Sequence, residues 1–209
     1  ASLDYLATIG WINDLTYLPD TTVDNESAFV TSWNVSANQT ITLNTHATYS
    51  YNYHIDWGDG TTENLTADAI HTYASSGLYE IKITGDFPYT QFCSSNSHTA
   101  LQKVIQWGAI EWQSMNSAFM FCSNLVISTL DLPNLSSVTD MSLMFSEAQA
   151  FNSDLSAWDV SNVTDMNNTF ALCFAFNQPL NSWDVSSVTS MSYMLIGCRP
   201  FNHPLNSWD

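Results

Sequence analysis

The sequence predicts a mainly β protein in which an antiparallel β-sandwich is followed by a short β/α solenoid. Two patterns favour this fold: apolar and polar residues alternate through the first half of the chain, and a 25-residue repeat fills the second half. The supply of apolar side chains agrees, because 45% of the 209 residues are hydrophobic and can form buried cores. We expect three parts: an extension over residues 1–26, a sandwich over 27–100 and a solenoid over 101–209.

Residues 1–26 form an apolar leader that fits neither pattern and ends in the polar link TTVDNES. Because its apolar side chains are unfavourable in water, we expect the leader to pack on its own sandwich or to reach a neighbouring molecule as an added strand. The candidate assembly residues are Leu6, Ile9, Trp11, Ile12, Leu15 and, in the last repeat, Trp208.

The sandwich is predicted from short strand-like segments. Residues 29–36, 39–45, 49–57 and 78–87 alternate apolar with polar residues or are rich in Thr, Tyr, Ile and Val. Turn-forming GDG and SSG sequences separate them, and several short strands at this spacing are typical of an antiparallel sandwich. The segment LQKVIQWGAIEW is expected to join the sandwich to the repeats.

The repeats are predicted to stack on one another. WDVSNVTDMNNTFALCFAFNQPLNS at 158–182 is followed by a close copy at 183–207, and a degenerate copy with a one-residue slip begins near Trp112. Each unit has too few large apolar residues to enclose a core of its own, so neighbouring units must cover one another. Apolar residues at 163, 166, 170 and 173 have helical spacing, which predicts one short helix and one strand per coil. The expected repeat core is Trp158, Trp183, Met166, Met191, Phe176, Phe201, Leu180 and Leu205.

Two family resemblances follow from these motifs. The segment around Trp57, Gly58, Asp59 and Gly60, followed by HTYASSGLYEIKITG, resembles a polycystic-kidney-disease (PKD) type domain, which implies an Ig-like β-sandwich. The repeats resemble those of BspA-like leucine-rich-repeat surface proteins, with FNQPLNSWDVSSVTSM at 176–191 as the closest stretch. This second resemblance implies a leucine-rich-repeat-like solenoid, cell-surface display, adhesion or assembly, and no catalysis.

The charge balance excludes several partners. Only 3 basic residues face 20 acidic ones, which gives a formal charge of -17. A surface so poor in Lys and Arg cannot bind nucleic acid or anionic lipid headgroups, and like charges keep the molecules soluble. No apolar run reaches the roughly 18 residues of a membrane span.

We expect a secreted protein, with Ala1 as a mature N-terminus left by cleavage at a small-residue site. Candidate glycosylation sites support this expectation. The seven sequons lie at Asn25, Asn34, Asn38, Asn64, Asn134, Asn162 and Asn167.

No cofactor is expected, and calcium is the one metal considered. Asp56 and Asp59 flank the GDG turn, with Glu63 and Asp68 nearby, and could supply oxygen ligands. Turn chemistry explains the same residues without a metal, because Gly permits positive φ and Asp caps the turn. The Asp159, Asp184 and Asp209 ladder fits coil closure better than a catalytic carboxylate pair.

The cysteines and histidines also have structural explanations. Three of the four cysteines, Cys122, Cys173 and Cys198, share the repeat position of Ala148, which favours reduced packing residues over disulfides; Cys93 is the fourth. The five histidines show no metal or triad motif, and His71 lies at a predicted strand start. We therefore expect no enzymatic activity.

Two functions remain in close competition, both extracellular. The first is a self-assembling surface or filament subunit whose head-to-tail contacts join the extension to an open solenoid end, because such a contact does not close. The alternative is a cell-surface adhesin or display module that binds a glycan or host surface ligand. A carbohydrate-binding module is a second alternative, since the tryptophan ladder could stack sugars, although the repeat register favours its burial.

Overall fold

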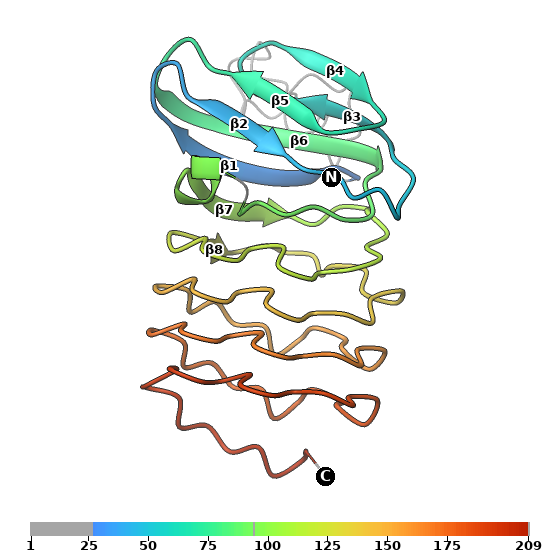
Figure 1. Ribbon diagram of the computed structural model, residues 1–209, viewed down its shortest axis with the longest axis vertical. Coiled ribbons are helices and arrows are strands. Elements are labelled where there is room, and N and C mark those ends of the chain that lie inside the picture. The colour runs from blue at the N-terminus through green and yellow to red at the C-terminus, as the bar shows by residue number, and fades with distance from the viewer. Residues whose placement is uncertain (1–26, 94, 209) are drawn as a thin grey trace, which may run out of the picture.

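The computed structural model describes residues 27–93 and 95–208, and this part of the chain is mainly β, as predicted (Figure 1). The candidate assembly residues between Leu6 and Leu15, and the sequon at Asn25, lie outside the described residues. The elements are β1 (Phe29–Val35), β2 (Thr40–Leu43), β3 (Asn52–Asp56), β4 (Thr62–Leu65), β5 (Ala69–Thr72), β6 (Gly77–Asp86), the 3-10 helix η2 (Ser95–Thr99), β7 (Leu101–Gln106) and β8 (Val126–Ile127).

The strands form two sheets. The larger has the order β4-β3-β6-β1-β7-β8, and β2 pairs with β5 in the smaller one. All pairs are antiparallel except β7 with β8, so the larger sheet is mixed rather than purely antiparallel. β1 lies near its centre, and its residues are buried on both faces except Asn34, which is typical of a covered central strand. Its buried Thr31 hydroxyl accepts a 2.8 Å hydrogen bond from the indole of Trp33.

The GDG sequence makes the turn between β3 and β4. The Asp56 carboxylate accepts the Gly58 N–H at 2.8 Å, and the Asp59 carboxylate accepts the Thr61 N–H at 3.0 Å. Gly58 has a positive φ of 77°, and a Cβ there would lie 2.5 Å from the Glu80 carbonyl oxygen. A glycine is therefore required for both the turn and the close approach of β6.

Below the sheets, the repeats lie one under another as successive loops of chain (Figure 1). Beyond β8 they contain turns and isolated parallel bridges, such as the one between Asp140 and Asp165. The predicted helix at 163–173 is wrong, because Asn168 and Leu172 both have left-handed φ values of 56° and 61°. A left-handed residue every four positions interrupts the right-handed backbone that a helix needs.

The resemblance to BspA-like leucine-rich-repeat proteins with a PKD-like domain is therefore not upheld. A leucine-rich repeat of the expected kind has a helix in each coil, whereas η2 is the one helical element in residues 27–93 and 95–208. The β/α solenoid predicted from the 25-residue repeat and from its helical spacing is not confirmed.

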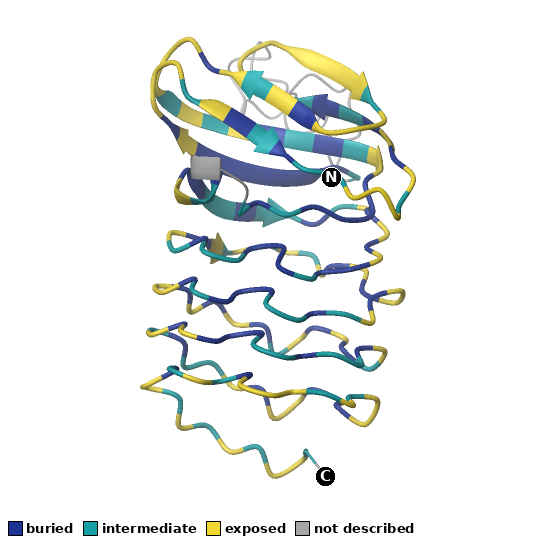
Figure 2. Cartoon of the chain, viewed as in Figure 1, coloured by how far each residue is buried: buried dark blue, intermediate teal, exposed yellow. Residues whose placement is uncertain are grey.

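One hydrophobic core runs from the sheets into the repeats. Trp107, just after β7, stacks on Phe29 of β1 at 5.6 Å and meets Trp158 edge to face at 5.4 Å. Further along, the rings of Phe119, Phe145 and Phe170 follow one another at 5.6 and 5.5 Å. Buried positions line the inside of both parts in Figure 2. The sheets and the repeats therefore pack as one body along β1 and β7.

Candidate assembly edge

Four equivalent backbone segments carry the contacts between repeats: residues 115–121, 141–147, 166–172 and 191–197, called here the turn segments. In each of the first three, every second N–H donates to a carbonyl of the following repeat, at 2.7–2.9 Å. Phe145, for example, donates to Thr169, and Phe170 donates to Met194. All twelve of these bonds point toward the C-terminal end of the stack. The backbone bonding of the turn segments is therefore directional: each turn segment presents donors to the next repeat.

Paired left-handed residues produce this alternation. The pairs are four residues apart: Ser117 with Phe121, Leu143 with Glu147, Asn168 with Leu172, and Tyr193 with Gly197. They are spaced by 26 residues between the first two turn segments and by 25 thereafter, which agrees with the one-residue slip seen in the sequence. Between them, i to i+3 hydrogen bonds such as Met144 to Met141, at 3.2 Å, keep the remaining N–H groups within the repeat.

The fourth turn segment has the same conformation but a different environment. Within residues 27–93 and 95–208, no acceptor faces the N–H groups of Met191, Tyr193, Leu195 and Gly197. Their equivalents in 166–172 all donate to the next repeat. We call this row of four donors the assembly edge.

Apolar side chains surround the assembly edge. Met141 and Met166 are 0% exposed, but Met191 at the same repeat position is 38% exposed. Tyr193 and Ile196 are 65% and 49% exposed. Figure 2 shows the change, since the last repeat is mostly exposed or intermediate while the repeats above it are blue along their inner side. Burial at these positions is supplied by a following repeat, so the edge combines unpaired donors with uncovered apolar surface.

Side-chain ladders run to the same edge. The Asn152 side chain accepts the N–H of Asn177, and the Asn177 side chain accepts that of Asn202, at 2.8 and 3.2 Å. The Trp183 indole donates to Leu155 at 2.9 Å, and the Trp208 indole donates to Leu180 at 3.1 Å. Trp208, predicted as an assembly residue, is therefore engaged by the preceding repeat and half-buried.

The burial of the predicted repeat-core residues decreases toward the last repeat. Trp158, Trp183, Met166, Phe176 and Leu180 are buried, whereas Phe201 and Leu205 are half-buried and Met191 is exposed. The buried tryptophans offer no surface for stacking a sugar. Among these residues, burial is lower only in the last described repeat.

The predicted calcium ligands are already used by protein donors. Asp59 accepts hydrogen bonds from Thr61 and contacts the His71 ring nitrogen at 2.8 Å, and Asp68 accepts the N–H and hydroxyl of Thr45. Burial raises the Asp59 pKa, but the bonds from Thr61 and His71 outweigh it and leave the pKa low. Across the described part of the chain, no three His, Cys, Asp or Glu side chains are grouped to hold a metal ion.

The acidic ladder of the repeats closes turns. Asp159 and Asp184 each accept the hydroxyl or N–H of the serine two residues on, and these bonds lower both pKa values. Asp209 lies outside the described residues. His71 stacks on Trp57 at 4.9 Å, a packing role that matches its bond to Asp59.

All four cysteines are free thiols. The Cys173 and Cys198 thiols donate to the carbonyls of Phe145 and Phe170 in the preceding repeats, at 2.9 and 3.1 Å. Burial raises the thiol pKa of Cys198 to about 11 and also raises those of Cys93, Cys122 and Cys173. These thiols are poor nucleophiles that serve as small packing groups and weak donors.

Most predicted glycosylation sites are accessible. Asn34, Asn38, Asn64, Asn134 and Asn162 are exposed. Asn167 is half-buried, and its side-chain oxygen accepts the Ser192 N–H and the Ser190 hydroxyl, both at 2.7 Å. A glycan on Asn167 would break these contacts between repeats.

The sequence reasoning missed Tyr193 and the N–H groups of the assembly edge. A signal was present, since Leu195 stands at the repeat position that Phe119, Phe145 and Phe170 occupy in the other repeats. No pattern of side chains reveals which backbone groups face the next repeat.

Comparison with known proteins finds a family that matches the repeats. Residues 113–209 are similar to a family described as "Mycoplasma protein of unknown function, DUF285". This finding, together with the absence of α-helices in the described repeats, contradicts the BspA-like leucine-rich-repeat assignment, and the matched residues do not include the segment expected to be PKD-like. No curated protein and no solved structure matches the chain significantly. Within the described residues, no helix has the length and apolarity that crossing a bilayer requires.

Proposed function

We propose that this protein is a non-enzymatic, extracellular structural protein that assembles with copies of itself, and that the assembly edge is one of its contact surfaces. The observation that carries this proposal is the row of donors at Met191, Tyr193, Leu195 and Gly197, flanked by exposed apolar side chains. An open row of N–H groups is a template for pairing with another backbone.

The hydrogen-bonding groups of the edge determine which backbone can pair with it. Since it offers donors only, it accepts a backbone that presents carbonyls at alternate residues, as every following repeat does. The apolar leader of residues 1–26 in a neighbouring copy is the occupant we propose, because it supplies apolar side chains to cover Tyr193 and Ile196. A head-to-tail contact of this kind does not close and builds filaments.

Extracellular placement is supported by chemistry at the surface. Exposed sequons and a formal charge of -17 suit a secreted, soluble molecule that meets copies of itself only through a defined contact. Asp59, Asp159 and Asp184 close turns, and His71 contacts Asp59 and stacks on Trp57, which supports a non-enzymatic role.

The first test replaces apolar surface at the edge with charge. We expect Tyr193→Asp with Ile196→Asp to abolish filaments seen by negative-stain electron microscopy, because two unpaired carboxylates would have to lose their water against an apolar partner segment. Leu78→Asp is the matched control, since Leu78 on β6 is also exposed and lies far from the repeats in sequence. Filaments that persist in the double variant, or a wild-type protein that stays monomeric at high concentration, would refute assembly through this edge.

A second variant tests the proposed occupant. Deletion of residues 1–20 should also abolish filaments, while leaving a folded monomer whose own assembly edge is intact. Mixing this deletion with the double edge variant should not restore growth, because neither molecule can extend a chain at both ends. Unchanged fibres from the deletion alone would show that another segment covers the edge.

The alternative role is a cell-surface adhesin. The exposed loop residues Leu130 and Leu132 favour it, because they form apolar surface on the side of the first repeat. The Asp131 carboxylate between them accepts the N–H groups of Trp107 and Gly108 at 2.9 and 2.8 Å, which holds both leucines outward.

A further inference from the structure

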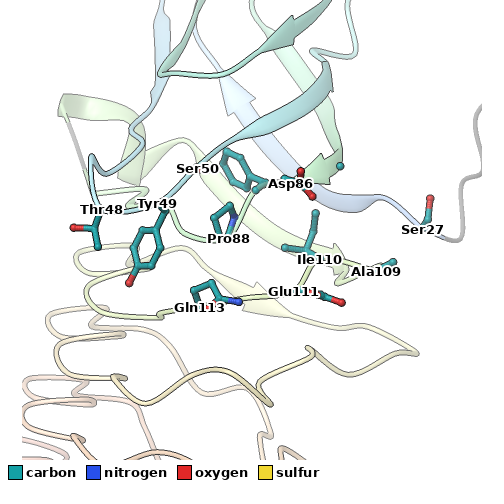
Figure 3. Close-up of a pocket in the computed structure, with 12 residues that line it drawn as sticks. Ser27, Thr48, Tyr49, Ser50, Asp86, Pro88, Ala109, Ile110, Glu111 and Gln113 are labelled. Atoms are coloured by element: carbon teal, nitrogen blue, oxygen red, sulfur yellow. The ribbon is translucent and has the colours of Figure 1, made fainter.

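A cavity of about 620 Å³ lies between the sheets and the first repeat (Figure 3). Its walls come from the loop before β3, the end of β6 and residues 109–113. A smaller cavity of about 180 Å³ adjoins it, since Thr48 and Tyr49 line both. We call the two together the seam groove. The larger part has the volume of small-molecule sites in other proteins, roughly 300–1,000 Å³.

An aromatic ring stands between the two parts of the groove. Tyr49 is half-buried and packs on Tyr89 at 5.6 Å and His46 at 6.1 Å between ring centroids. Figure 3 shows its ring beside Thr48, across the cavity from Gln113. No hydrogen bond to the Tyr49 hydroxyl is found within residues 27–93 and 95–208. The ring therefore offers a face and a polar tip to a ligand.

Hydrogen bonds hold the walls of the groove together and leave its exposed side chains available to a ligand. The Tyr51 hydroxyl donates to the Tyr89 carbonyl and accepts the His46 N–H, both at 3.0 Å. Across the seam, the Gln113 N–H donates to the Pro88 carbonyl at 2.8 Å. Because the walls are tied together beforehand, a ligand need not order them on binding.

Exposed polar side chains complete the lining. Asp86 and Glu111 supply carboxylate oxygens, and Gln113 supplies an amide, while Ile110 and Pro88 add apolar wall. Asn116 and Asp140 add further polar groups in the smaller part. The lining contains acceptors and amide donors but no Lys or Arg, so it repels anionic ligands and suits neutral ones rich in hydroxyl groups.

We propose that the seam groove binds a short neutral oligosaccharide, with one sugar ring stacked on Tyr49 and its hydroxyls donating to Asp86 and Glu111. A sugar ring has an apolar face that packs on an aromatic ring, and its hydroxyl groups form charge-assisted hydrogen bonds with carboxylates. This site is independent of the assembly edge, which lies at the opposite end of the stack (Figure 1). It assigns a ligand class to a surface that shares no residue with the assembly edge.

The test measures binding of neutral trisaccharides of glucose, xylose, mannose and N-acetylglucosamine, with trigalacturonate as the acidic counterpart. Saturation-transfer NMR and isothermal titration calorimetry would be run on the edge double variant, so that failure of assembly does not affect the outcome. We expect at least one neutral trisaccharide to bind at millimolar concentration or tighter and trigalacturonate not to bind.

Variants locate the site. Tyr49→Ala should weaken binding roughly tenfold or more, because the stacking face is lost, whereas Tyr49→Phe should retain most of it. Tyr79→Ala is the matched control, since that tyrosine lies on β6 outside the groove. Circular dichroism would verify that each variant is folded. Failure of all neutral trisaccharides to bind, preference for the acidic sugar, or equal affinity of Tyr49→Ala and wild type would each overturn the proposal.

Discussion

At the residue scale, left-handed backbone is the feature on which the repeats depend. Bulky residues such as Leu143, Leu172 and Tyr193 hold φ near 60°, a conformation that costs about 1–2 kcal/mol for a side chain with a Cβ. The repeats retain it because each of the first three pairs also sets four hydrogen bonds to the next repeat. Gly197 is the one glycine at these positions, with φ 81°, and it belongs to the repeat in which those bonds are not made.

Three glycine substitutions separate backbone strain from crowding. Gly60→Ala adds strain alone, because nothing lies within 4 Å of the new Cβ. Gly197→Ala adds strain and a 2.9 Å contact with the Leu172 side chain, and Gly58→Ala adds strain and a 2.5 Å contact with a backbone oxygen. We expect the free energy of unfolding, measured with urea, to fall by about 1 kcal/mol for Gly60→Ala, about 1–2 kcal/mol for Gly197→Ala and about 3 kcal/mol or more for Gly58→Ala. A different order would contradict the backbone geometry described for these turns.

The Cys198 thiol predicts a specific pH dependence. In the folded chain burial raises its pKa to about 11, above the ordinary value of 9.0. Because the folded state then keeps the proton that the unfolded state releases, this contribution to stability is complete below pH 9 and is lost as pH rises toward 11. Urea unfolding should show that the stability of wild type falls more steeply across this window than that of Cys198→Ala. Equal slopes would indicate that this thiol is solvated in the folded chain.

At the element scale, the alternation of apolar and polar residues predicted the strands well, whereas the helical spacing of apolar residues in the repeats predicted a helix that does not form. The patterns at 29–36 and 78–87 correspond to β1 and β6 within a few residues. The burial of β6 alternates with a two-residue period, whereas β1 is buried on both faces and is revealed by its β-branched and aromatic residues. The spacing of Val163, Met166, Phe170 and Cys173 suits a helix and also a run of tight turns that point every third or fourth residue inward. The identity of a leucine or a tyrosine does not predict a positive φ, because bulky residues rarely adopt this conformation.

The candidate site was predictable only in part. The 25-residue period of Trp158, Trp183 and Trp208 predicts stacking, because units this small cannot bury their apolar side chains alone. The direction of the hydrogen bonds and the parallel pairing of β7 with β8 depend on backbone geometry, which the sequence does not display. The seam groove joins residues 48–49, 86–88 and 110–113, which no local motif connects.

Circular dichroism checks the corrected secondary structure of the repeats. The described residues contain no α-helix, so the far-ultraviolet spectrum should lack the paired minima of helical proteins and be dominated by β and turn signals. A leucine-rich-repeat solenoid with a helix in each coil would instead give a clear helical contribution. A fragment of the repeats alone is unsuitable for this measurement, because their core continues into the sheets through Trp107.

At the scale of the whole molecule, the sheets act as a cap on one side of the repeats. The Phe92 N–H donates to Ala118 and the Gln113 N–H to Pro88, so the first turn segment is joined to the sheet module. The other side ends in the assembly edge, where four donors face away from the stack. N–H groups at equivalent repeat positions are thus hydrogen-bonded in 166–172 and, within the described part of the chain, not bonded in 191–197, so the two sets can be compared within the same molecule.

Amide hydrogen exchange resolved by residue tests this account most directly. In dilute monomer, the N–H groups of Met166, Asn168, Phe170 and Leu172 should exchange slowly, and those of Met191, Tyr193, Leu195 and Gly197 should exchange rapidly. At concentrations that give filaments, the second set should become protected while the Tyr193→Asp, Ile196→Asp variant stays unprotected there. Slow exchange of the second set in the monomer, or no gain of protection in the filaments, would contradict both the open edge and its role in assembly.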